Sequence, residues 1–249
     1  MYKKITKELV LDMAHEMKNM VLETGGKGIV VCISGGKDST VVAGLAKLTG
    51  LPVLGVLLPN GVQKDISDSR TVVETLGIQY KIANIKAMYD AMIDEANNGE
   101  GVKPTLTEQA LINLAPRLRM AAGYFFSQCY GYRVMNTCNM SETMVGYETR
   151  WGDAVGDYAP LAQFTVKEVL EIGDILVDML GLPTSLIHKT PSDGLCGKSD
   201  EDNLGLTYAE IDNFLLNHEL PKDQAHAERL DTLIQKSEFK RQPIPYYHK

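Results

Sequence analysis

A short apolar run followed by two glycines and a polar turn constrains this chain more than any other feature. Residues 29–33, Ile-Val-Val-Cys-Ile, are mostly β-branched, which is typical of a buried parallel strand. The polar stretch Ser-Gly-Gly-Lys-Asp-Ser-Thr occupies 34–40, and apolar residues then recur at helical spacing from Val41 to Leu48. The segment therefore predicts a strand, a glycine turn and a helix.

The turn has the composition of a phosphate-binding loop. Gly35 and Gly36 let the backbone approach a ligand closely, because no Cβ is in the way. The first amides of the following helix lack intrahelical partners and carry positive partial charge, which suits phosphate. Lys37 adds a cation, and Asp38 adds a carboxylate of the kind that binds magnesium. The turn does not have the Gly-x-x-x-x-Gly-Lys-Ser/Thr spacing of a Walker A loop.

Composition restricts the class of protein. The 249 residues carry a net charge of −7, which argues against a general nucleic-acid-binding surface. No stretch reaches the ~18 apolar residues of a membrane span, and the charged N-terminus is unlike a signal peptide. The four cysteines, Cys32, Cys129, Cys138 and Cys196, are scattered without a Cys-x-x-Cys pair. We therefore expect free thiols and a cytoplasmic protein that binds neither nucleic acid nor membrane.

Strand and helix patterns alternate along the first half of the chain. They predict strands over 28–33, 52–58, 78–82 and 133–137, and helices over 38–49, 66–76, 85–96 and 105–128. Such alternation is typical of an α/β fold with a doubly wound parallel sheet flanked by helices.

The remaining segments are predicted to be mainly helical. An apolar stripe over 5–21 predicts an amphipathic helix that packs against the core or a partner chain. Helical patterns over 165–180, 207–217 and 222–237 predict a helical C-terminal portion. We expect residues 188–205 to form a loop and Lys240 to lie in a tail. Because no linker interrupts the pattern, one domain over 1–249 is expected.

A second polar stretch follows the fourth predicted strand. Residues 136–142 read Asn-Thr-Cys-Asn-Met-Ser-Glu, and ligands of open α/β sheets lie beyond the carboxyl ends of strands. Asp38 lies just beyond the first strand, so Asp38 and Glu142 are predicted to meet and to bind Mg²⁺ together with the phosphates of a ligand. The alternative is that Glu142 only complements the N-terminus of its helix.

Three further stretches have functional and ordinary interpretations. Residues 146–160 combine glycines, Arg150, two aspartates and the only tryptophan, either as a substrate loop or as a surface loop. Asn113 and Arg117 share one helix face, and an arginine there could bind phosphates or carboxylates. The alternative is that Arg117 is simply solvated. Residues 188–201 carry Lys189 and Ser192, and the length of this segment predicts a mobile lid that ATP orders. The alternative is a solvated acidic loop.

Residues 34–39 match Ser-Gly-Gly-x-Asp-Ser, which resembles the pyrophosphate (PP) loop of the ATP pyrophosphatases. The five stretches taken in order are similar to NAD synthetases over nearly the whole chain. This resemblance implies an adenine nucleotide alpha hydrolase-like fold and a homodimeric ligase. Such an enzyme uses ATP and Mg²⁺ to adenylate the nicotinate carboxylate of deamido-NAD, releases pyrophosphate, and lets ammonia displace AMP.

The resemblance also implies roles by position. The residues expected to bind ATP are Cys32, Ile33, Ser34, Gly35, Gly36, Lys37, Asp38, Ser39, Thr137, Lys167 and Ser192. Asp38 and Glu142 are the expected metal ligands and, with Lys189, the expected catalytic residues. Arg117, Arg150, Asp157 and Lys240 are expected to face deamido-NAD.

The sequence departs from the family pattern at three of these places. Arg150 stands where the family often has lysine. Val166 replaces a common ATP-contacting lysine, with Lys167 one residue later. Phe239 replaces a histidine before Lys240. The first change keeps the charge, the second puts that ATP contact in question, and the third weakens the assignment of Lys240.

The cysteines bear on the nitrogen donor. None of them lies in an evident nucleophile setting, and the synthetase-like stretches leave no room for a glutaminase domain. We therefore expect free ammonia as the donor. Two competing interpretations keep the loop but change the acceptor: another PP-loop amidotransferase, or a tRNA-thiolation enzyme. The net charge of −7 argues against the tRNA-thiolation enzyme. A non-catalytic ATP-binding domain is the remaining alternative.

Overall fold

Four parallel strands form the centre of the computed structural model, which describes residues 4–62, 66–189 and 199–248. The strands are β1 (Ile29–Cys32), β2 (Val53–Leu57), β3 (Gln79–Ile82) and β4 (Arg133–Met135), in the order β3-β2-β1-β4. All four predicted strands are confirmed. β4 stops at Met135 rather than residue 137, because the backbone N–H of Asn136 donates to the carbonyl of Tyr158 rather than to β1.

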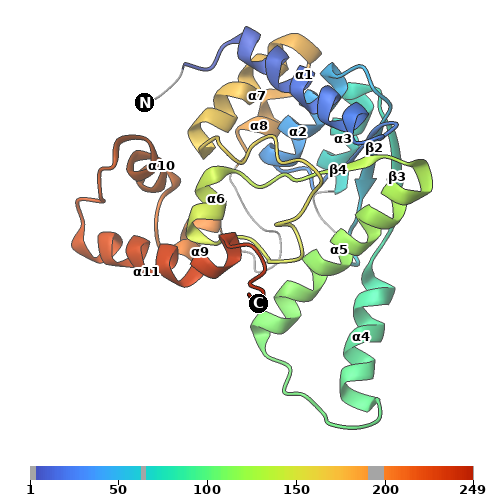
Figure 1. Ribbon diagram of the computed structural model, residues 1–249, viewed down its shortest axis with the longest axis vertical. Helices are drawn as coiled ribbons and strands as arrows, with labels where there is room; N and C mark the ends of the chain where they lie inside the picture. Colours follow the sequence, from blue (N-terminus) through green and yellow to red (C-terminus); the bar gives the residue numbers. More distant parts are fainter. Residues whose placement is uncertain (1–3, 63–65, 190–198, 249) are drawn as a thin grey trace.

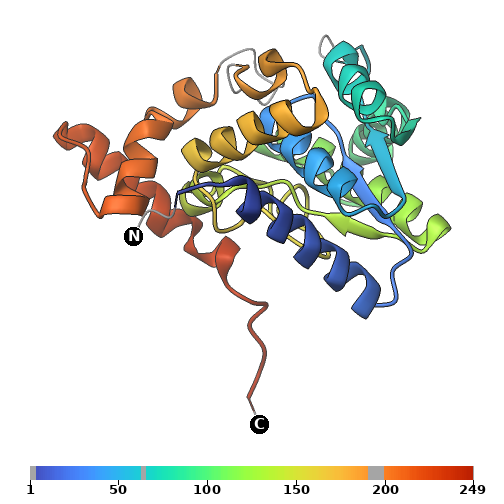
Figure 2. The same ribbon diagram turned by 90° about the horizontal axis from the view of Figure 1, so that it is seen from above.

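Helices cover both faces of the sheet, as Figures 1 and 2 show. One face is covered by α1 (Lys7–Glu23), α2 (Lys37–Leu48), α3 (Ile66–Leu76), α7 (Val166–Leu180) and α8 (Thr184–Ile187). The other is covered by α4 (Lys86–Asn98) and α5 (Glu108–Tyr130). The C-terminal group contains α9 (Asp200–Leu204), α10 (Tyr208–Asn217) and α11 (Gln224–Arg241), which lie beside α6 (Met140–Val145). The doubly wound α/β prediction is confirmed.

Alternation along β1 divides its side chains between two cores. Ile29 and Val31 pack with α1, α2, α3 and α7, whereas Val30 packs with β2 and α5 on the opposite face. The apolar stripe of α1 lies against the first core, where Met17 is fully buried. This stripe therefore covers the chain's own sheet rather than a partner chain.

Helix α5 continues through Pro116, which lies in its interior. Proline has no amide hydrogen, so one intrahelical bond is missing there. The proline ring packs against Gly152, since a Cβ on that glycine would lie 3.0 Å from the Cβ of Pro116. Helix α5 thus passes directly beside the loop formed by residues 146–160.

Two sequence-based expectations about the C-terminal portion were wrong. Part of the loop expected over 188–205 is helical, because Ser199 caps α9 through the backbone N–H of Asp202. Lys240 belongs to the last turn of α11 rather than to a tail, and that turn is held by Arg241, which donates to the carbonyl of Met144. Residues 190–198 lie outside the described part, and with them Ser192, Cys196 and most of the expected lid.

Within the described ranges, no helix is both long and apolar enough to cross a membrane.

Candidate functional site

The strand order creates a divergence point between β1 and β4. From β1 the chain proceeds outward to β2 and β3, and it returns to the opposite side of β1 as β4. Loops that leave the carboxyl ends of two such strands turn away from each other, which opens a crevice at the sheet edge. Here the two loops are the predicted phosphate loop and residues 136–139.

The loop after β1 has a conformation that depends on glycine. Gly35 has a φ of +84°, and a Cβ there would lie 3.0 Å from both the Cβ of Asp68 and the backbone N of Ser69. Gly36 is the N-cap of α2 and makes no side-chain capping bond, so the first amides of the helix face the loop. Ser34 and Ser39 brace the loop through hydroxyl oxygens 3.1 Å apart.

A buried charged cluster joins the two loops. The Lys37 side chain is only 5% exposed, and its Nζ lies 2.8 Å from Asp38 Oδ2 and 3.7 Å from Glu142 Oε1. Asn139 donates from Nδ2 to Asp38 Oδ1 at 2.9 Å. The structure therefore brings Asp38 and Glu142 together around one lysine.

The cluster has an unequal charge distribution. Burial would lower the pKa of Lys37, but Asp38 and Glu142 outweigh it and raise that pKa, so the ammonium is retained. Burial raises the pKa of Glu142, and the nearby Asp38 carboxylate raises it further. Two carboxylates held this close favour a cation between them. Glu142 also accepts from the backbone N–H of Asn139, so it complements its helix as well as facing Lys37.

The other residues expected at the ATP end occupy different surroundings. Lys189 Nζ lies 2.8 Å from Asp68 Oδ2, and Asp68 adjoins Gly35, so Lys189 is close to the phosphate loop. Thr137 follows β4 and is half-buried, while Lys167 is exposed at the start of α7.

Cys32 and Ile33 turn their side chains into the cores. A Cβ on Gly123 of α5 would lie 3.0 Å from Cys32 Sγ, and one on Gly55 would lie 2.8 Å from Ile33 Cδ1. Burial raises the pKa of Cys32 to about 11. These two residues therefore present only backbone to the phosphate loop.

Three predicted cations gather around the 146–160 loop. Arg117 donates from Nη2 to the carbonyl of Arg150 at 3.4 Å. Lys240 donates to the carbonyls of Gly146 and Glu148 at 2.7 and 2.6 Å, so it holds the loop from α11. Burial lowers the pKa of Lys240, and the charge of Arg117 acts in the same direction.

Two departures from the family pattern contact each other. The Arg150 guanidinium lies 5.0 Å from the Trp151 ring and 5.5 Å from the Phe239 ring. A planar guanidinium stacks on aromatic faces in a way that an ammonium does not, so arginine at 150 and phenylalanine at 239 suit one another. Trp151 has a φ of 62°, which a bulky side chain rarely adopts, and its ring remains half-exposed.

Asp157 is placed differently from these cations. Its carboxylate accepts from the backbone N–H of Val134 at 2.8 Å and from the Tyr124 hydroxyl at 3.3 Å. It therefore fastens the loop to β4 and α5. None of the contacts seen in the described ranges joins it to Arg117, Arg150 or Lys240.

Sequence reasoning assigned no site role to Asn139, Tyr208 or Asp200. The Asn-x-x-Glu spacing of a capping box marks Asn139, but not its bond to Asp38. The Tyr208 ring lies 5.5 Å from Lys37 Nζ, and its hydroxyl donates to Asp200 Oδ2 at 3.4 Å. No local signal reveals this contact, because α10 and the phosphate loop are far apart in sequence.

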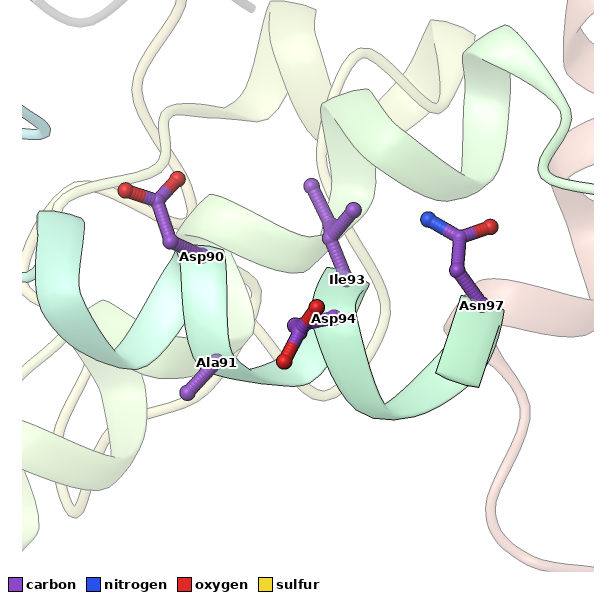
Figure 3. A pocket seen from close by; sticks show the side chains of 5 residues that line it. All are labelled: Asp90, Ala91, Ile93, Asp94 and Asn97. Carbon is purple, nitrogen blue, oxygen red and sulfur yellow. The ribbon is translucent and has the colours of Figure 1, made fainter. Parts of the chain in front are cut away.

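A shallow hollow elsewhere on the surface is separate from this site. Figure 3 shows its five lining residues, all from α4: Asp90, Ala91, Ile93, Asp94 and Asn97. Asp90 is already paired with Lys86 of the same helix. None of the residues predicted from the sequence lines it, so it carries no part of the site.

Comparison with known proteins agrees with this geometry. The sequence profile described as NAD synthase matches residues 9–244. The NH3-dependent NAD+ synthetase of Pyrococcus horikoshii is 38% identical over 236 residues, which are 89% of this chain and 88% of that protein. The solved NMN synthetase of Francisella tularensis has a TM-score of 0.88 at 30% identity, over 99% of this chain and 100% of that one. The NH3-dependent NAD synthetase of Campylobacter jejuni has a TM-score of 0.76 at 26% identity, over 98% and 100%. The chain therefore belongs to the NAD synthase family.

Proposed function

We propose that this chain catalyses the ATP-dependent amidation of deamido-NAD to NAD, with ammonia as the nitrogen donor. The observation that carries this proposal is the meeting of Lys37, Asp38 and Glu142 at the point where β1 and β4 diverge. A cation and two carboxylates beside a glycine loop suit a triphosphate. The family membership of the chain supports the acceptor and the donor.

The residues at this edge account for the first half of the reaction. The α2 amides and Lys37 hold the phosphates, and their positive charge stabilises the charge that develops on pyrophosphate as it leaves. The nicotinate carboxylate attacks the α-phosphorus, and the adenylate that forms carries a good leaving group. Neutral ammonia then attacks the acyl carbon, and AMP departs. Catalysis of this kind depends on positioning and charge rather than on a protein nucleophile.

Magnesium fits the donor set. Asp38 and Glu142 supply carboxylate oxygens, which Mg²⁺ prefers. Burial raises the pKa of Glu142 and the nearby Asp38 carboxylate raises it further, so an added cation close to both carboxylates would stabilise their ionised forms. In the part of the chain that the structure covers, no three His, Cys, Asp or Glu residues are grouped to hold a metal. Mg²⁺ commonly uses one or two carboxylates together with substrate phosphates, so Asp38 and Glu142 would suffice. When bound, the ion would neutralise phosphate charge.

The second half of the substrate site is proposed around the 146–160 loop. Arg117, Arg150 and Lys240 give it a concentration of positive charge that suits the phosphates and carboxylate of deamido-NAD. Lys189, beside Asp68 and the phosphate loop, is proposed to act at the ATP end. The role of Asp157 is to anchor this loop, since its carboxylate already has two hydrogen-bond donors.

Three assays of the purified chain test this function. ATP, Mg²⁺ and deamido-NAD are supplied with ammonium chloride, with ammonia-free glutamine, or with no nitrogen source. NAD, AMP and pyrophosphate should form in equal amounts with ammonium alone. Comparable turnover with glutamine would overturn the assignment of ammonia as donor, and failure to form NAD with either would overturn the function.

A second acceptor is favoured by one observation. The Francisella NMN synthetase matches this fold with a TM-score of 0.88, against 0.76 for the Campylobacter NAD synthetase. The same nicotinate carboxylate occurs on the mononucleotide, so the chemistry is unchanged and only the length of the acceptor differs. The ratio of kcat/KM for deamido-NAD and for nicotinate mononucleotide decides between them.

We further propose that the chain is a cytoplasmic homodimer with one domain over 1–249. The α1 stripe no longer supports a dimer, because it is buried in the chain's own core. The exposed apolar side chains of Phe125 in α5 and of Met88 and Met92 in α4 are the candidate contacts. Light scattering at micromolar concentration tests the dimer, and a mass of 27.4 kDa would contradict it.

A further inference from the structure

Asp200 is a buried carboxylate outside the group of residues proposed to bind the substrates. The residue is 6% exposed and lies at the start of α9. Its two oxygens accept from different parts of the chain: Oδ1 from the Tyr147 hydroxyl at 3.2 Å, and Oδ2 from the Tyr208 hydroxyl at 3.4 Å. A buried carboxylate is costly unless hydrogen bonds compensate it. These tyrosines provide that compensation and tie Asp200 to α10 and to the 146–160 loop.

Tyr208 connects Asp200 to the phosphate loop. Its side chain is buried, and its ring lies 5.5 Å from Lys37 Nζ, within the range of a cation–π contact. Burial raises the pKa of the Tyr208 hydroxyl, and Glu142 and Asp200 raise it further, so the hydroxyl keeps its proton and donates. The ring is thus held at its hydroxyl by Asp200, while its face lies beside the Lys37 ammonium.

The Asp200 carboxylate also interacts electrostatically with the Lys37 ammonium. Asp200 contributes to the raised pKa of Lys37, although Asp38 and Glu142 contribute more. In the proposed function, the Lys37 ammonium also binds the phosphates of ATP. A fixed aromatic face beside the side chain restricts where the ammonium can move.

We propose that Asp200 is a positioning residue, which holds the Tyr208 ring against Lys37 and thereby sets where the Lys37 ammonium meets the phosphates of ATP. This inference rests on the proposed function, because it needs ATP as the ligand of Lys37. By this proposal, α9 and α10 orient the Lys37 side chain, which lies far from them in the sequence.

The test uses Asp200→Asn, Tyr208→Phe and the double variant. Asp178→Asn is the matched control, since it makes the same chemical change at an exposed side chain of α7, away from this link. ATP binding is measured by titration calorimetry without the second substrate, and KM is measured separately for ATP and deamido-NAD. Tyr208→Phe keeps the ring and removes only the hydroxyl, so it provides an answer even if Asp200→Asn does not fold.

Each single variant is expected to weaken ATP binding about tenfold, which corresponds to the loss of a hydrogen bond to a charged group. The double variant should be no weaker than the worse single one, because both changes break the same link. KM for deamido-NAD should stay within about twofold, and the control should match wild type.

Unchanged ATP affinity in folded Asp200→Asn or Tyr208→Phe would overturn the inference. The inference would also be overturned if the losses of ATP affinity in the two single variants multiplied in the double variant. A parallel rise of both KM values with a lowered melting temperature would overturn it too, because that result indicates a structural role. If the wild-type chain bound no ATP, the proposed function itself would be refuted, and this inference with it.

Discussion

Gly35→Ala is the perturbation whose magnitude the structure fixes best, because the chain contains a matched glycine. Gly35 and Gly50 both have left-handed backbone, with φ of +84° and +71°. A Cβ at Gly50 meets nothing within 4 Å, whereas one at Gly35 lies 3.0 Å from Asp68 Cβ and Ser69 N. Gly50→Ala therefore measures the conformational cost alone, and Gly35→Ala adds steric overlap with α3.

The two costs are separable in magnitude. A left-handed L-residue costs about 1–2 kcal/mol, part of which is offset by the lower entropy of the unfolded alanine chain. Overlap in a packed region adds about 1–3 kcal/mol. We expect Gly35→Ala to be less stable than Gly50→Ala by that second amount, which corresponds to roughly 2–12 °C in melting temperature for a domain of this size.

Urea unfolding followed by circular dichroism measures the stabilities, and titration calorimetry measures ATP affinity. Gly35→Ala should bind ATP more weakly, because relief of the overlap moves the phosphate loop, while Gly50→Ala should bind as wild type does. If the two variants were equally stable and bound ATP equally well, the contact between the loop and α3 would not constrain the loop.

Three further predictions address the chemistry. Asp38→Asn and Glu142→Gln should each lower turnover by at least about 100-fold, because catalysis here depends on fixed charge. Circular dichroism should show an intact fold in both variants. Near-wild-type rates at limiting Mg²⁺ would contradict the metal assignment. At pH 8, iodoacetamide should label exposed Cys129 and spare Cys32 and Cys138, since burial raises the pKa of both latter thiols and the thiolate is the nucleophile. Peptide mass spectrometry reads this result against a denatured sample, in which all three should react. At subsaturating total ammonia, the rate should rise with pH because neutral NH₃ is the attacking form, and a flat profile would point to another donor.

The parts of the site that lie on regular elements were predictable from the sequence. The β-branched run and its two glycines predict β1, the phosphate loop and α2 through local rules alone. That Asp38 and Glu142 meet follows from one general property: carboxyl ends of parallel strands share an edge. Where the chain obeys local periodicity and this edge rule, the prediction and the structure agree.

The contacts that sequence reasoning missed all join segments that are far apart in the chain. Arg150 and Phe239 appeared as two separate departures, and only the structure shows that the guanidinium stacks on that ring. Tyr208 lies on an amphipathic helix whose pattern explains its burial but not its proximity to Lys37. Helix α9 is five residues long, which is too short for a periodicity to be recognised.

The position of β4 beside β1 has a consequence for how the protein folds. The bond between Asn139 and Asp38 joins residues 101 positions apart, and closing a loop of that length costs about 4 kcal/mol of chain entropy. β1, β2 and β3 pair through short crossovers, so this part of the sheet can assemble before β4 arrives. Such an intermediate has the phosphate loop but lacks Asn139 and Glu142. During refolding, high-affinity nucleotide binding should therefore recover later than helical signal, at the step that docks the last strand.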